Sequence, residues 1–208
     1  MKRAPAFCGV ILAAGESSRM GRPKALLPWR RGTFLSAAIQ VLNNYSDMVI
    51  VVAGGLVNEL QPVVDANAAY LVRNPQPERG QFSSLQIGLQ EVLNRGRDAA
   101  IITLVDRPPA RPETVNHLQR QFLTLVEHDM WAVVPESAGY HGHPIVVGRE
   151  MIGAFLDAPV DSTARDIVHA NQSRVAYVPV SDPFVTMNID TPQDYERLIA
   201  SPEFSVTR

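Results

Sequence analysis

The chain has 208 residues, of which 46% are hydrophobic, and its 19 basic and 21 acidic side chains leave a net charge of −2. This length and apolar content suffice for one sizeable core, so we expect a single domain over residues 1–208. The near-neutral charge excludes the basic footprint of a protein that binds nucleic acid or an anionic membrane. A lone cysteine, Cys8, excludes an internal disulfide, and no apolar run reaches the length of a membrane span. We therefore expect a cytoplasmic protein.

Short β-rich runs alternate with amphipathic segments along the chain. Apolar runs predict strands at 10–12, 48–52, 70–72, 99–105, 131–134, 144–147 and 184–189. Helical spacing predicts helices at 34–42, 57–66, 85–93 and 115–125, whereas residues 149–180 show no clear pattern. A last helix begins at Thr191 as N-cap, with Pro192 in its first turn and Asp194 completing a capping box. The alternation predicts a Rossmann-like three-layer α/β fold with a mostly parallel, mixed sheet.

The segment 12–24 leaves a buried strand and enters a loop whose basic side chains include Arg19 and Lys24. Gly15 and Gly21 let the backbone approach an anion, and the two cations can neutralise a triphosphate. The loop has neither the Walker A spacing nor the dinucleotide fingerprint, so a P-loop ATPase and a dehydrogenase are not supported. The alternative interpretation is a flexible turn with two solvated cations.

Asp106 follows the most strand-like run, at the sheet edge where open α/β sheets bind ligands. A carboxylate there can hold magnesium, and the alternative is an aspartate that caps a loop. Ser83 and Ser84 begin a helix and can present hydroxyls and N–H groups to a ligand, or one of them can be an ordinary N-cap. His141 and His143 invite a metal interpretation, but no further His or Cys cluster supports a transition-metal site there.

Five segments together resemble the MobA-like nucleotidyltransferases, and most closely their molybdenum cofactor cytidylyltransferase branch. The first is Leu12-Ala-Ala-Gly-x-Ser-x-Arg-Met-Gly-x-x-Lys24. In family order follow Gly80-Gln-Phe-Ser-Ser-Leu-Gln-Ile-Gly-Leu89, Asp106-Arg-Pro108, Gly142-His-Pro144 and Asn188-Ile-Asp-Thr-Pro-Gln-Asp-Tyr195. The resemblance spans about residues 8–199, which we take as the core of the domain.

The resemblance implies transfer of CMP from CTP to a molybdopterin cofactor, with release of pyrophosphate and with magnesium as cofactor. It implies that Asp106 and Asp190, each expected at the end of a strand, hold the metal. A molybdoenzyme or its maturation factor is a possible partner. The implied catalytic residues are Arg19, Lys24 and Asp106; the nucleotide-binding residues are Leu12, Ala13, Ala14, Gly15, Arg19, Lys24, Ser83 and Ser84; and the acceptor-binding residues are Gly142, His143 and Pro144.

The chain departs from the cytidylyltransferase pattern at three places. Arg107 stands where that branch commonly has glutamine, Asn188 replaces an acidic residue, and the stretch 161–165 lacks the family's glycine. Two alternatives stay open: a sugar- or alditol-phosphate nucleotidyltransferase, and a non-catalytic carrier of the molybdenum cofactor. The choice between CTP and GTP is also open, although Ala14, where guanylyltransferases have glycine, favours CTP by resemblance.

Overall fold

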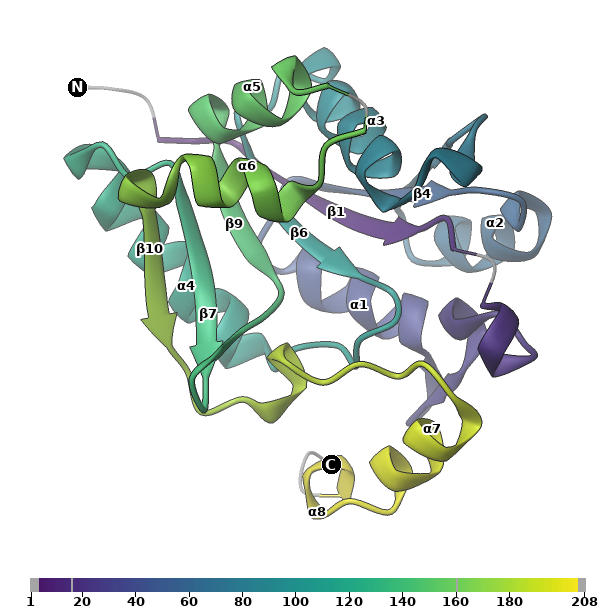
Figure 1. The fold of residues 1–208 in the computed structure, drawn as a ribbon. Coiled ribbons are helices and arrows are strands. Elements are labelled where there is room, and N and C mark those ends of the chain that lie inside the picture. The colour runs from purple at the N-terminus through teal and green to yellow at the C-terminus, as the bar shows by residue number, and fades with distance from the viewer. Residues whose placement is uncertain (1–3, 16, 160, 206–208) are drawn as a thin grey trace.

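The computed structural model describes residues 4–15, 17–159 and 161–205, which form a three-layer α/β/α sandwich (Figure 1). The predicted Rossmann-like fold with a mostly parallel, mixed sheet is therefore confirmed. The main sheet has the strand order β10-β7-β9-β6-β1-β4-β5, with β8 paired to β7. Its strands are β1 (Phe7–Ala13), β4 (Met48–Ala53), β5 (Tyr70–Arg73), β6 (Ala99–Leu104), β7 (Ala132–Ser137), β8 (Tyr140–His141), β9 (Ile145–Gly148) and β10 (Val175–Pro179).

The centre of the sheet consists of three parallel strands that end at one edge. In the register of β1, Leu12 lies beside Val52 of β4 on one side and beside Leu104 of β6 on the other. All of β1 is buried, as its continuous apolar run predicts for a strand covered on both faces. Strand β9 runs antiparallel to β6 and β7 and makes the sheet mixed. The carboxyl ends of β1, β4 and β6 therefore lie together.

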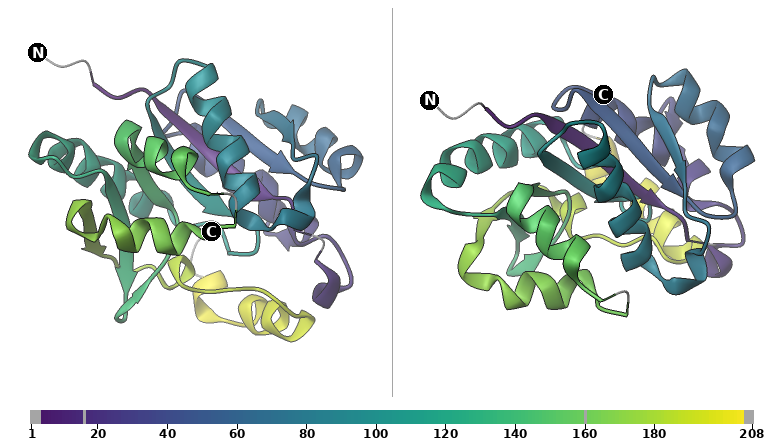
Figure 2. Two further views of the ribbon diagram at one scale, coloured as in Figure 1. Left: turned by 45° about the horizontal axis from the view of Figure 1, so that its top comes forward. Right: turned by 90° about the horizontal axis from the view of Figure 1, so that it is seen from above.

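Helices cover both faces of the sheet (Figure 2). Their apolar sides pack into two separate clusters of buried residues, one on each face. No helix in the described ranges is long and apolar enough to cross a membrane. One face carries α1 (Phe34–Asn43), α2 (Val57–Ala66) and α4 (Pro112–Leu125), and the other carries α3 (Gln81–Asn94), α5 (Arg149–Asp157) and α6 (Ala164–Ala170).

A third, smaller apolar cluster joins the C-terminal helices α7 (Pro192–Ile199) and α8 (Pro202–Ser205) to the hairpin β2 (Pro28–Trp29) and β3 (Gly32–Thr33). At its centre, the Trp29 ring lies edge-to-face with Phe34, Phe184 and Phe204 at centroid distances of 5.2–5.6 Å. Met20 of the basic loop is buried in the same cluster. The C-terminal segment thus anchors the loop that was predicted to bind phosphate.

The predicted strand at 184–189 is wrong. Residues Pro183–Val185 form a 3-10 turn, and an irregular segment follows it. Proline begins this turn, and the buried carboxylate of Asp182 caps it by accepting a hydrogen bond from the Phe184 N–H at 3.1 Å. Phe184, Met187 and Ile189 instead enter the third cluster, whereas Val185 packs into the cluster on the α1 face. The capping box of Thr191 and Asp194 is confirmed, with Pro192 in the first turn of α7.

Candidate active site

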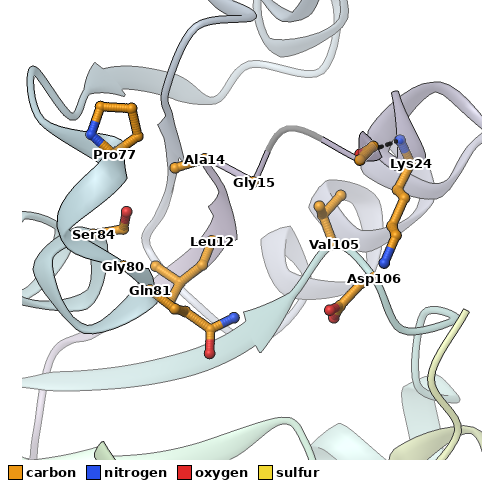
Figure 3. A pocket seen from close by; sticks show the side chains of 11 residues that line it. Leu12, Ala14, Gly15, Lys24, Pro77, Gly80, Gln81, Ser84, Val105 and Asp106 are labelled. Carbon is orange, nitrogen blue, oxygen red and sulfur yellow. Dashed lines mark hydrogen bonds between the residues drawn. The ribbon is translucent and has the colours of Figure 1, made fainter. Parts of the chain in front are cut away.

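A cleft with a volume of about 230 Å³ lies at the carboxyl ends of β1 and β6 (Figure 3). The chain extends from β1 to β4 and β5 on one side, and returns to β6 on the other side, so the cleft lies at the switch point of the sheet. Eleven residues from three segments line it: Leu12, Ala14, Gly15, Ser17, Lys24, Pro77, Gly80, Gln81, Ser84, Val105 and Asp106.

Two 3-10 turns, Ser18–Met20 and Lys24–Leu26, shape the basic loop that follows β1. Ser17 and Gly21 flank the first turn in the left-handed region, and the Ser17 hydroxyl accepts a hydrogen bond from the Lys24 N–H at 3.1 Å. The side chain of Lys24 is 11% exposed, whereas that of Arg19 is 71% exposed. The alternative of two solvated cations therefore describes Arg19 but not Lys24.

Two cations of the loop, Lys24 and Arg19, pair with one carboxylate oxygen, Oδ1 of Asp190. The Lys24 Nζ lies 2.6 Å from this oxygen and the Arg19 Nη2 lies 3.3 Å from it. The hydrogen bond from Lys24 is the main reason why the pKa of Asp190 is lowered, and the charges of both cations act in the same direction. Asp190 does not end a strand, as was predicted, but lies in the irregular segment just before the N-cap Thr191.

Asp106 lies in a turn just after β6 and borders the cleft, as predicted from the end of the central strand. Its backbone carbonyl accepts a hydrogen bond from the Ile189 N–H at 2.8 Å. Because Asp190 directly follows Ile189, this bond brings Asp190 near Asp106. Its Oδ1 is buried without a hydrogen-bond partner among the described residues. Figure 3 shows the Lys24 side chain extending toward this carboxylate. A loop-capping role would have satisfied the oxygen, so the orphaned atom favours a ligand.

The carboxylates at this end of the cleft suit a hard divalent cation that keeps most of its water ligands. The described residues contain no group of three or more His, Cys, Asp or Glu side chains that could enclose a metal. Magnesium is usually held by one or two carboxylates, with water and substrate phosphates completing its octahedron. The unpartnered Oδ1 of Asp106 fits this chemistry, and Asp190 is the second carboxylate at this end of the cleft.

Ser83 and Ser84 belong to the first turn of α3, which begins at Gln81, so neither is its N-cap. The Asn74 Nδ2 donates to both hydroxyls, at 3.0 Å and 2.9 Å, and Ser83 donates in turn to the Gly80 carbonyl. Only Ser84 lines the cleft. The Ser83 hydroxyl instead links the loop before the helix, and its role in nucleotide binding stays a prediction.

Strand alternation also separates the residues of the first motif. Leu12, Ala14 and Gly15 line the cleft, whereas the side chain of Ala13 is buried in the cluster on the α1 face. The predicted role of Ala13 can therefore involve only its backbone. Ala14 approaches β4 closely, since a Cβ on Gly54 would lie 2.7 Å from the Ala14 carbonyl oxygen.

Sequence reasoning missed several residues that build the cleft, among them Gly54, Asn74 and Gln81. Gly54 directly follows β4 and leaves room for Ala14 and Pro77. Asn74 is buried and links the segment 74–80 to α3. Gln81 lines the cleft at the start of α3 (Figure 3). The Gly54-Gly55 pair and the Asn74-Pro75 pair were signals of loops at these points, but not of a shared site.

The predicted acceptor residues Gly142, His143 and Pro144 lie outside the lining of this cleft, between β8 and β9. A Cβ on Gly142 would lie 2.0 Å from the Val185 carbonyl oxygen, so glycine is required there. That carbonyl accepts hydrogen bonds from the His143 N–H and from Nη1 of Arg107, both at 2.9 Å.

The two histidines near this turn have different surroundings. The exposed His141 stacks on the Tyr177 ring at 4.0 Å and pairs with Glu136 at 3.4 Å. Burial and the Arg107 charge lower the pKa of His143 to about 3, so its imidazole is neutral at physiological pH. Burial also lowers the pKa of Arg107, while the charges of Asp106 and Asp190 oppose this effect.

An open, mostly parallel sheet with a basic loop and an unpaired carboxylate at its switch point defines a class of α/β proteins that bind phosphorylated ligands. Comparison with known proteins gives the family. Residues 9–176 match the MobA-like NTP transferase domain, and the chain belongs to this family. It is a nucleotidyltransferase, and the resemblance found in its motifs is confirmed.

Relatives of similar length carry different names. The molybdenum cofactor cytidylyltransferase of Escherichia coli (strain K12) is 26% identical over 89% of this chain and 92% of its own. The molybdenum cofactor guanylyltransferase of Xanthomonas euvesicatoria pv. vesicatoria (strain 85-10) is 29% identical over 93% and 94%. The nicotine blue oxidoreductase of Paenarthrobacter nicotinovorans is 28% identical over 94% and 97%.

Solved structures of one mycobacterial relative have the same fold. Rv0371c from Mycobacterium tuberculosis H37Rv superposes with a TM-score of 0.79 at 30% identity, covering 96% of this chain and 100% of that chain. A complex of Rv0371c with manganese gives a TM-score of 0.74 at 27% identity, covering 94% and 99%. A divalent metal is thus present in a structure of a relative.

Proposed function

We propose that the protein transfers CMP from CTP to a molybdopterin-type acceptor, with magnesium as its metal, and releases pyrophosphate. The observation that carries this proposal is the arrangement at the end of the cleft. Lys24 and Arg19 converge on Asp190, and Asp106 presents a buried oxygen that no described residue satisfies. Two cations for phosphate and two carboxylates for a metal are the groups that nucleotidyl transfer requires.

In the proposed reaction a phosphate oxygen of the acceptor attacks the α-phosphorus of CTP. A new P–O bond forms, the bond between the α-phosphorus and the bridging oxygen breaks, and the electron pair leaves with pyrophosphate. When bound, magnesium neutralises charge on the phosphate oxygens. Lys24 and Arg19 transfer their hydrogen bonds from Asp190 to the triphosphate and stabilise the charge that develops on the leaving group. The protein acts by positioning and by electrostatics.

The cleft suits a nucleotide better than it suits a nucleic acid chain or a lipid. Leu12 and Ala14 offer an apolar wall to a base, and Gln81 and Ser84 offer amide and hydroxyl groups beside it. Among the residues that line the cleft, Lys24 is the basic one, and its side chain extends toward Asp106 (Figure 3). We propose that the base lies toward α3 and the triphosphate toward Lys24. The preference for CTP over GTP is proposed from Ala14 and from the cytidylyltransferase among the relatives.

Pyrophosphate release from a matrix of substrates tests the proposal. Purified protein with magnesium is given each of the four common nucleoside triphosphates with molybdopterin, and mass spectrometry identifies the product. We expect CTP and molybdopterin to give a cytidine dinucleotide, with at least a hundredfold less product from an Asp106→Ala control. Release that does not exceed the control with any nucleotide would refute the proposal.

The same matrix distinguishes the alternatives. Turnover with sugar or alditol phosphates, and not with the pterin, would favour the other nucleotidyltransferase. Thermal stabilisation by the pterin alone, without a response to nucleotide and magnesium, would favour a non-catalytic carrier. Faster turnover with GTP than with CTP would favour a guanylyltransferase, the activity in the name of the Xanthomonas relative.

A further inference from the structure

Three buried polar atoms without partners belong to Asp106, which lines the cleft, and to two residues that share one carbonyl group, Arg107 and His143. Among the described residues, six buried side-chain nitrogen or oxygen atoms lack a hydrogen-bond partner. Three of the six are Oδ1 of Asp106, Nε of Arg107 and Nδ1 of His143. Buried polar atoms in folded proteins are nearly always paired, and an exception needs an explanation. A ligand that binds here would satisfy several of these atoms at once.

One carbonyl group holds Arg107 and His143 together. The Val185 carbonyl oxygen accepts a hydrogen bond from Nη1 of Arg107 and another from the His143 N–H, each at 2.9 Å. Val185 can come this close only because residue 142 has no side chain. Since Nη1 is used in this way, the rest of the guanidinium keeps its remaining N–H donors for another partner.

The pair differs in chemistry from the basic loop. Arg107 carries a permanent charge, whereas burial keeps His143 neutral, with a pKa of about 3. Neither residue lines the nucleotide cleft, and each is partly exposed as a residue, although Nε of Arg107 and Nδ1 of His143 are buried. Arg107 directly follows Asp106 in the chain, whereas the Lys24 side chain extends toward Asp106 from the cleft (Figure 3). A guanidinium with neutral hydrogen-bonding neighbours is suited to a phosphate monoester.

We propose that Arg107, with His143 beside it, binds the phosphate group of the acceptor. This inference rests on the proposed function and extends it to a residue that departs from the family pattern. The acceptor oxygen would then approach the α-phosphorus from the Arg107 side, and pyrophosphate would leave on the Lys24 side. Because Asp106 and Asp190 repel an anion, the subsite is complete only when metal and nucleotide are bound, so the acceptor binds last.

The acceptor dependence of the reaction tests the subsite. Arg107→Gln should raise the KM for the phosphorylated acceptor about 10- to 100-fold, the range expected for a lost charge-assisted hydrogen bond. The KM for CTP should change less than about twofold, and kcat less than about threefold. Arg120→Gln, the same change on the exposed side of α4, is the matched control and should alter neither KM. An unchanged acceptor KM, or an equal rise in both KM values, would overturn the proposal.

A binding measurement separates this inference from the proposed reaction. Inorganic phosphate is titrated against protein that is saturated with magnesium and a CTP analogue whose α,β-bridging oxygen is replaced by methylene, and ³¹P NMR detects binding. Wild type and Arg120→Gln should bind phosphate saturably, and Arg107→Gln at least tenfold more weakly. Equal affinities, or no binding to wild type, would overturn the subsite. Phosphate binding that depends on Arg107 without turnover of the pterin would refute only the proposed reaction.

Folding of the variant is checked by the same titration. Stabilisation by magnesium and CTP should match that of wild type if the loss of the bond to Val185 leaves the fold intact. If Arg107→Gln does not fold, Arg107→Lys replaces it, since lysine keeps the charge but cannot keep the planar fork. The lysine variant should bind phosphate more weakly than wild type, and an equal affinity would overturn the proposal.

Discussion

Replacing Lys24 by methionine should separate nucleotide binding from folding. Methionine keeps an unbranched apolar stem and removes the charge that lies 2.6 Å from Asp190. The Lys24 side chain is only 11% exposed, so its ammonium is directed at the site and not at bulk water. If Lys24 serves mainly to bind phosphate, its loss should weaken CTP binding strongly and change the stability of the fold only slightly.

The magnitudes of the two effects follow from the surroundings of the pair. Asp190 is 30% exposed and keeps Arg19 as a second partner, so the lost ion pair should destabilise the fold by at most about 1 kcal/mol. For a chain of this length that lowers Tm by about 2–4 °C. A lost charge-assisted hydrogen bond to phosphate is worth about 1.5–3 kcal/mol, which corresponds to about a 10- to 100-fold higher Kd for CTP with magnesium.

Calorimetric titration of CTP with magnesium, together with thermal unfolding, measures both effects on one sample. Arg19→Gln is the matched control, because Arg19 pairs with the same oxygen at 3.3 Å but is 71% exposed, and we expect a rise in Kd below about fivefold. A Kd for Lys24→Met within twofold of wild type would refute the assignment of Lys24 to the triphosphate. A large fall in Tm with unchanged binding would show that the lysine is structural.

Three further outcomes are expected. Gly54→Ala places a Cβ 2.7 Å from a carbonyl oxygen of the cleft and should lower the free energy of unfolding by about 1–3 kcal/mol, whereas Gly55→Ala, with nothing described within 4 Å, should change it by less than about 0.5 kcal/mol in urea unfolding. Folding lowers the pKa of His143 to about 3, so the unfolded chain binds a proton at this residue at a higher pH than the folded chain does. The free energy of unfolding should therefore fall as pH drops from about 6.5 to 3. His143→Gln should flatten this part of the plot of unfolding free energy against pH, and parallel plots for the variant and wild type would contradict the assignment. Phe204→Ala should shift Trp29 fluorescence to longer wavelength, since the two rings lie 5.2 Å apart, and an unchanged spectrum would contradict their packing.

The central fold was predictable because its signals are local. The buried strands β1, β4 and β6 are continuous apolar runs, and Thr191 with Asp194 marks a helix start within four residues. The edge strand β10 and the helices α5 and α6 were not predicted, since their short patterns alternate weakly. The false strand at 184–189 shows the limit of periodicity. The segment is apolar because its side chains pack into two clusters, with Phe184 against Trp29, and not because it pairs with the sheet.

The candidate site was predictable where one segment carries several of its groups. Lys24 and Ser84 lie in motifs whose composition indicates phosphate or helix-end chemistry, and Asp106 follows the central strand; all three line the cleft. The contacts between segments were not predictable. The pairing of Asp190 with the basic loop joins residues 166 positions apart, and the role of Gly54 depends on the loop that covers it. Such contacts leave no periodic trace in the sequence.

The metal affinity of the cleft tests the central claim most directly. Manganese is titrated against the protein with and without CTP, and the EPR signal of the free ion reports binding. We expect one site that tightens at least tenfold when CTP is present and weakens at least tenfold in Asp106→Asn. Equal manganese affinity in wild type and Asp106→Asn, with CTP present, would contradict the assignment of this carboxylate to the metal.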